Sequence, residues 1–159
     1  MTLARRSLLL SLASLLTAIL GAGSALARPT GDELTDQAMA AINEIVQTVE
    51  TDTADLEALA IAAFEELALH PDADKRERLI EKAGRKFMKF TDKARAKVAK
   101  MIDKIAVKAA RRIAKVDGDP DLIAQVESIR TAAQANCTQL LDDMWDAIAQ
   151  AQEDALGAS

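Results

Sequence analysis

The five residues Asp117-Gly118-Asp119-Pro120-Asp121 form the clearest boundary between two helices in this sequence. Gly118 suits the left-handed conformation in which many helices end, and Asp119 is a good N-cap for a following helix. Proline is favoured in the first helical turn, and the acidic Asp121 complements the positive end of the helix dipole. The stretch therefore predicts that one helix ends near residue 116 and that another begins at residue 120.

Two further boundaries complete the predicted helices. Thr30 and Glu33 have the spacing of a capping box, which marks a helix start. His70-Pro71 marks a helix end, because the residue before proline is pushed out of the helical region. Between these boundaries, apolar residues recur at helical spacing, and the predicted apolar stripe of the first helix passes through Ala63. We expect three helices, over residues 31–69, 73–116 and 120–156.

The composition favours an all-α fold. The 159-residue chain is 50% hydrophobic but only 3% aromatic, with no tyrosine, whereas sheet proteins draw on β-branched and aromatic residues. Because the predicted connections are only a few residues long, neighbouring helices should be antiparallel. We predict a single domain over residues 28–159, an elongated antiparallel up-down-up three-helix bundle with a thin, alanine-rich core.

Residues 1–27 are interpreted as a signal peptide. Arg5 and Arg6 supply the positive n-region, residues 8–20 the apolar h-region, and Ala25-Leu26-Ala27 the cleavage site. The exported chain would then be secreted or lie in the bacterial periplasm. The alternative is an uncleaved membrane anchor, because the uncharged stretch that follows Arg6 reaches the roughly 20 residues of a membrane span.

Few side chains in this sequence could support catalysis. The single cysteine, Cys137, and the single histidine, His70, are the main candidates for a nucleophile and its base, but the predicted bundle separates them far beyond hydrogen-bond reach. One cysteine also excludes CxxCH haem attachment, a Cys-rich zinc site and an internal disulfide. We expect Cys137 to be a buried thiol, with an intermolecular disulfide as the alternative. The prediction is a non-enzymatic chain without a cofactor.

Acidic clusters raise the question of a metal site. Asp117, Asp119 and Asp121 alternate along the chain, but they do not match the twelve-residue EF-hand loop. Helix capping and the helix dipole account for all three carboxylates. The Glu-x-x-His pair of carboxylate di-iron bundles is also missing from the sequence. We therefore predict no metal site.

Charge is distributed unevenly along the chain. Residues 28–74 contain one basic and twelve acidic side chains, residues 75–115 contain sixteen basic and four acidic ones, and residues 116–159 contain one basic and nine acidic ones. One interpretation is internal complementarity, in which a basic central helix pairs with two acidic neighbours and so fixes their order.

A second interpretation concerns five basic side chains of the central helix that point away from its apolar face. At about 100° per residue they fall opposite the apolar positions, where neither acidic neighbour easily reaches them. We call these residues the cationic ridge: Arg78, Lys82, Arg85, Lys89 and Lys100. Such a surface suits an anionic polymer, a membrane surface or an acidic protein. Nucleic acid is a weaker candidate, since no aromatic residues interleave with the basic ones.

Two arginines interrupt the apolar faces of the predicted helices. Aligning the helices by height places Arg95 near Glu50 or Asp142, and Arg130 near Asp36. Each arginine could form a buried ion pair that sets the helix register. The alternative is that its charged end extends into water while its stem covers the core.

These features together predict an exported helical module that acts in interaction or scaffolding, with homo-oligomer formation as a further expectation. The alternative is a periplasmic chaperone or carrier that opens its alanine-rich core for apolar clients.

Overall fold

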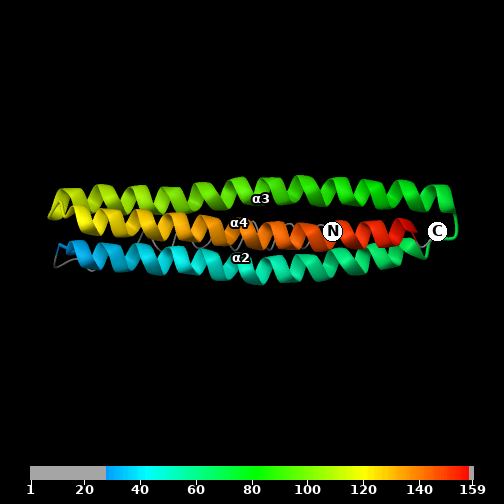
Figure 1. Cartoon of the computed structure of the whole chain (residues 1–159), viewed down its shortest axis with the longest axis horizontal. Coiled ribbons are helices and arrows are strands. Elements are labelled where there is room, and N and C mark those ends of the chain that lie inside the picture. Colours follow the sequence, from blue (N-terminus) through cyan, green and yellow to red (C-terminus); the bar gives the residue numbers. More distant parts are fainter. Residues whose placement is uncertain (1–27, 158–159) are drawn as a thin grey trace. The chain divides into compact units, whose positions relative to one another are not determined.

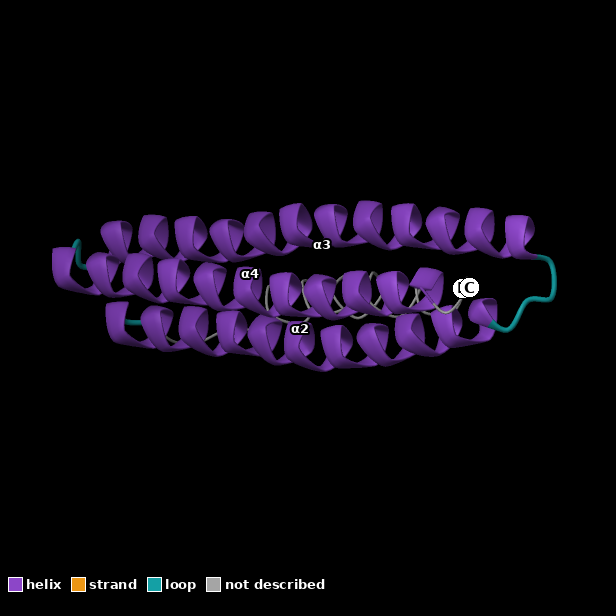
Figure 2. Cartoon of the chain, turned by 45° about the vertical axis from the view of Figure 1, so that its right-hand side comes forward, coloured by secondary structure: helices purple, strands orange, loops and turns teal. Residues whose placement is uncertain are grey.

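The computed structural model describes residues 28–157, in which all regular structure is α-helical (Figures 1 and 2). The helices are α2 (Gly31–Ala68), α3 (Ala73–Val116) and α4 (Pro120–Gly157), and Figure 2 shows short loops between them. The predicted all-α fold with three helices is thus confirmed for this part of the chain. The predicted signal peptide, residues 1–27, lies outside the described residues.

The two ends of α2 follow the local sequence. At its start, the Glu33 N–H donates to Thr30 Oγ1 (3.2 Å), and the Thr30 N–H donates to Glu33 Oε2 (2.9 Å). This reciprocal pair is the predicted capping box. At its end, the N–H groups of Leu69 and His70 donate to carbonyls three residues earlier. The chain therefore tightens just before the proline, and α2 ends at Ala68, one residue earlier than predicted.

The loop between α3 and α4 has the predicted capping geometry. Gly118 has a φ of 68°, and its N–H donates to the Ile113 carbonyl (3.0 Å), as does that of Asp117 (3.2 Å). This is the left-handed helix end that favours glycine. Asp119 Oδ1 then accepts a hydrogen bond from the Asp121 N–H (2.9 Å), which caps α4. The boundary predicted from this stretch is confirmed.

The described chain divides into two compact units, each of which contains part of every helix. Unit 1 comprises residues 28–48 and Val98–Cys137, and unit 2 comprises Val49–Lys97 and residues 138–157.

Unit 1 is held together by a buried cluster to which all three helices contribute. Much of this cluster is alanine, so the helix backbones approach closely and the core stays thin. The first residue of α2 also contacts the α3–α4 loop, where the Gly31 N–H donates to Asp117 Oδ2 (3.2 Å). The cluster consists of Leu34, Ala38, Ala106, Ala109, Ile113 and Val126.

Unit 2 contains an aromatic pair at its core. The ring centroids of Phe64 and Phe87 are 5.8 Å apart, and the planes are tilted by 56°. Phe64 is completely buried, although the predicted apolar stripe passed through Ala63 instead. Ala63 is only half-buried. The predicted stripe was wrong at this position because several adjacent stripes fit the pattern of an alanine-rich helix equally well. Phe64 lies one turn after the buried Ala60 and so shares its face.

One acidic side chain of unit 2 is poorly accommodated. Asp52 is half-buried, and its Oδ2 is buried with no hydrogen-bond partner in the described chain. Burial raises the pKa of Asp52 above its ordinary value, with a smaller contribution from the Asp55 carboxylate. The helix nevertheless continues through this stretch, where Thr53 Oγ1 donates to the Val49 carbonyl (2.8 Å).

Replacement of Asp52 by asparagine is expected to stabilise the protein at pH 7. A carboxyl with a raised folded-state pKa favours the folded state below its ordinary pKa of 3.8, and this advantage is lost as the pH rises through the folded-state pKa. Asp52→Asn removes this unfavourable charge and should therefore raise the melting temperature at pH 7. The increase should be small, roughly 1–3 °C, because the group is only half-buried. Thermal unfolding at pH 3, where the carboxyl is neutral, should show almost no difference. Asp36→Asn, at an exposed position of the same helix, is the control, and an equal gain at both pH values would contradict the prediction.

Candidate functional site

The cationic ridge lies on the exposed face of α3. All five of its members are exposed, whereas Ile80, Ala83, Phe87 and Ala94 of the same helix are buried. The first four members follow one another at helical spacing within unit 2, and Lys100 belongs to unit 1. The amphipathic pattern of α3 thus turns its core side and its ridge side in different directions.

Most of the ridge cations form no ion pair with a carboxylate of the described chain. Arg85 Nη1 lies 3.3 Å from Glu81 Oε2, but both side chains are well exposed, at 62% and 47%. An exposed pair of this kind contributes only about 0–1 kcal/mol, so Arg85 remains available to a ligand. The other four members form no ion pair within 4.0 Å with any residue of 28–157.

Arg95 joins α3 to α4 within unit 2. Its guanidinium contacts the carboxylate of Asp142 directly, and its Nη1 lies 3.7 Å from Asp92 Oδ1. Asp142 is one of the two predicted partners. Glu50, the other, is exposed on α2 and is not in this group of contacts, because Arg95 is directed at α4.

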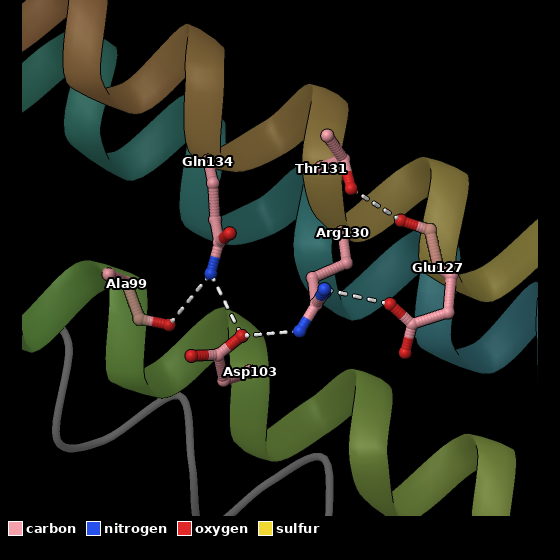
Figure 3. Close-up of polar contacts among 6 residues, drawn as sticks. All are labelled: Ala99, Asp103, Glu127, Arg130, Thr131 and Gln134. Atoms are coloured by element: carbon pink, nitrogen blue, oxygen red, sulfur yellow. Dashed lines mark hydrogen bonds and ion pairs between the residues drawn. The ribbon is translucent and has the colours of Figure 1, made fainter.

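Arg130 belongs to a polar network that joins α3 to α4 within unit 1 (Figure 3). Its Nη1 lies 3.1 Å from Asp103 Oδ1, and its Nη2 lies 2.9 Å from Glu127 Oε2. Gln134 Nε2 donates to the same Asp103 oxygen (2.9 Å) and reaches the Ala99 carbonyl at 3.4 Å. The Asp103 carboxylate of α3 therefore accepts hydrogen bonds from two side chains of α4.

The predicted pairing of Arg130 with Asp36 is wrong. Asp36 is an exposed residue of α2, whereas the Arg130 guanidinium is directed at α3. Helix height alone cannot show which of two neighbours a side chain faces. A signal was nevertheless present, because Glu127 and Gln134 lie three residues before and four residues after Arg130, on the same helix face.

Truncation of Asp103 to alanine should destabilise the protein by about 1–2 kcal/mol. The change leaves the Arg130 guanidinium with one carboxylate and removes an acceptor from the Gln134 amide, and a half-buried polar group that loses its partner carries a cost of this order. Asp103→Asn is the matched control, since it keeps an acceptor oxygen without the charge and should cost less. Urea unfolding followed by circular dichroism measures both variants. Equal stability of Asp103→Ala and the unmodified chain would show that the network contributes nothing.

The environment of the candidate nucleophile, Cys137, does not favour reactivity. Cys137 is 2% exposed, in agreement with the predicted buried thiol, and burial raises the pKa of this thiol to about 11. Little thiolate therefore forms near neutral pH, and the thiolate is the nucleophilic species. His70 lies after α2, where its Nδ1 accepts a hydrogen bond from the Asp72 N–H (3.2 Å).

The acidic residues of the α3–α4 loop bind backbone groups. Asp117 accepts hydrogen bonds from the N–H groups of Gly31 and Asp119, and Asp119 accepts one from Asp121. In the part of the chain that the structure describes, no group of three or more His, Cys, Asp or Glu side chains could hold a metal ion.

Comparisons with known proteins give no family assignment. The chain matches no family model, no curated protein and no solved structure. None of the helices within residues 28–157 combines the length and hydropathy that a membrane span requires.

Proposed function

We propose that the chain is an exported, non-enzymatic helical module that binds an anionic envelope surface through the cationic ridge. The observation that carries this proposal is the row of four exposed cations in unit 2, of which three have no ion pair with residues 28–157. In this proposal residues 1–27 direct export to the periplasm or the medium. The non-enzymatic part is supported by the raised pKa and the burial of Cys137.

The proposed module is an antiparallel up-down-up bundle. Support comes from contacts within each unit, taken separately. In unit 1 the first residue of α2, Gly31, contacts Asp117, which follows the end of α3. In unit 2, Phe64 from the late part of α2 packs against Phe87 from the early part of α3. Pairing of a helix start with a neighbour's end is the pattern of antiparallel helices.

The form of the ridge favours a surface with many anionic groups over a single small ligand. Its unit 2 members recur every three or four residues, so successive members lie about 4.5–6 Å apart along the helix axis. Such a row matches laterally distributed headgroups, each basic side chain contributing about 1 kcal/mol near an anionic membrane. An acidic protein, including the acidic α2 or α4 of a second copy of this chain, is the competing partner.

The proposal is tested by sedimentation of the full-length chain with vesicles. Vesicles with 30% phosphatidylglycerol should retain the chain at 20 mM salt and release most of it at 500 mM, because salt screens the ridge. Vesicles of phosphatidylcholine alone control for binding through the apolar residues 8–20, and the variant Arg5→Gln with Arg6→Gln controls for the positive charge that precedes them. Equal retention on both vesicles, or none on either, would overturn the proposal.

A further inference from the structure

Unit 1 contains an open groove between α2 and α3 that the cationic ridge does not include. The groove has a volume of about 300 Å³. Its apolar side is formed by Leu34, Ala38, Ala41, Ile105 and Ala109. Three of these five residues are alanines, whose methyl groups leave unfilled the space that larger side chains would occupy between the two helices.

The groove carries an excess of positive charge on its rim. Lys108 and Arg112, one turn apart on α3, line it. Both are exposed and form no ion pair within 4.0 Å with residues 28–157. Glu44 is the one acidic lining residue. An apolar floor beside two unpaired cations is complementary to a molecule with an apolar chain and a negatively charged head.

We infer that this groove binds a single-chain anionic amphiphile, with its carboxylate or phosphate head at Lys108 and Arg112 and its chain along the alanines. The volume is at the lower limit of the roughly 300–1,000 Å³ typical of ligand sites, which favours one chain over a two-chain lipid. The α2 residues that line the groove run from Leu34 to Glu44, about 15 Å at ~1.5 Å per residue. At roughly 1.2 Å per backbone bond of an extended chain, this length matches an alkyl chain of about twelve carbons.

The inference is independent of the proposed function, since no residue of the cationic ridge lines the groove. It also differs from a carrier that opens its core, because Leu34, Ala38 and Ala109, which the groove shares with the buried cluster of unit 1, form its floor without having to separate.

Calorimetric titration of the full-length chain with dodecanoate, below its micellar concentration, tests the inference. We expect one saturable site per chain, and binding about tenfold weaker for an uncharged dodecyl glycol ether or for dodecyltrimethylammonium, since each charge-assisted hydrogen bond contributes on this scale. Lys108→Glu with Arg112→Glu should weaken dodecanoate binding at least about tenfold. Ala40→Phe, at an exposed lining position, should weaken dodecanoate and the glycol ether alike by filling the groove.

The matched control is the double variant Lys104→Glu, Arg111→Glu, which makes the same charge change at exposed positions of α3 outside the groove. It should bind dodecanoate as the unmodified chain does. Absence of a saturable site would overturn the inference; this result is expected if another apolar segment fills the groove. So would equal affinity for the three ligands, or a loss in the control variant as large as in the groove variant. Circular dichroism of each variant verifies that its helices remain folded.

Discussion

Phe64→Ala is expected to lower the free energy of unfolding by about 3–5 kcal/mol, the usual cost of removing a buried aromatic ring. Phe64 is completely buried, and its ring packs against that of Phe87 with centroids 5.8 Å apart. The preceding residues of α2 include Ala60, Ala62 and Ala63, which have no rotamers with which to fill the cavity. Since small proteins are stable by only about 5–15 kcal/mol, a loss of this size should be visible as a large drop in the urea midpoint.

Two control variants make the measurement specific. Leu59→Ala removes an apolar side chain from the same helix at a position that is 55% exposed, and should change the stability by less than about 0.5 kcal/mol. Phe64→Leu keeps most of the buried volume and should cost less than Phe64→Ala. A loss below about 1 kcal/mol for Phe64→Ala would contradict the packing described for unit 2.

The helix boundaries could be predicted from the sequence because they depend on local chemistry. The Thr30–Glu33 capping box and the left-handed Gly118 involve residues at most a few positions apart, so residue type and spacing are sufficient. The exposed positions of α3 could also be predicted from the sequence, because a strongly amphipathic helix shows by its own pattern which face is turned outward.

Tertiary partners were predicted less well, because they depend on the rotation of each helix about its axis. Asp142 was found for Arg95, but Asp36 was wrongly assigned to Arg130, whose partners are Asp103 and Glu127. The groove between α2 and α3 was missed for a related reason. Its lining residues come from two helices, and the alanines that create the space look like ordinary core positions in either helix alone.

Reversal of three ridge charges is expected to abolish binding to anionic vesicles. Arg78→Glu, Lys82→Glu and Lys89→Glu together replace three exposed cations of unit 2 that have no ion pair with residues 28–157. At about 1 kcal/mol for each basic residue near an anionic membrane, the lost attraction alone amounts to about 3 kcal/mol, or more than 100-fold in affinity. Repulsion between the new carboxylates and the headgroups adds to this loss.

The matched control for the ridge is Lys104→Glu, Arg111→Glu and Lys115→Glu, which lowers the net charge of the chain equally at exposed positions of α3 outside both the ridge and the groove. If the ridge binds the surface, this variant should keep most of its vesicle affinity at 20 mM salt while the ridge variant loses its own. If both variants lose the same amount, net charge controls binding and the ridge has no special role. The distinction matters because the whole chain has a formal net charge of −5. Attraction to an anionic surface therefore requires a local excess of positive charge. We propose that the ridge supplies this excess.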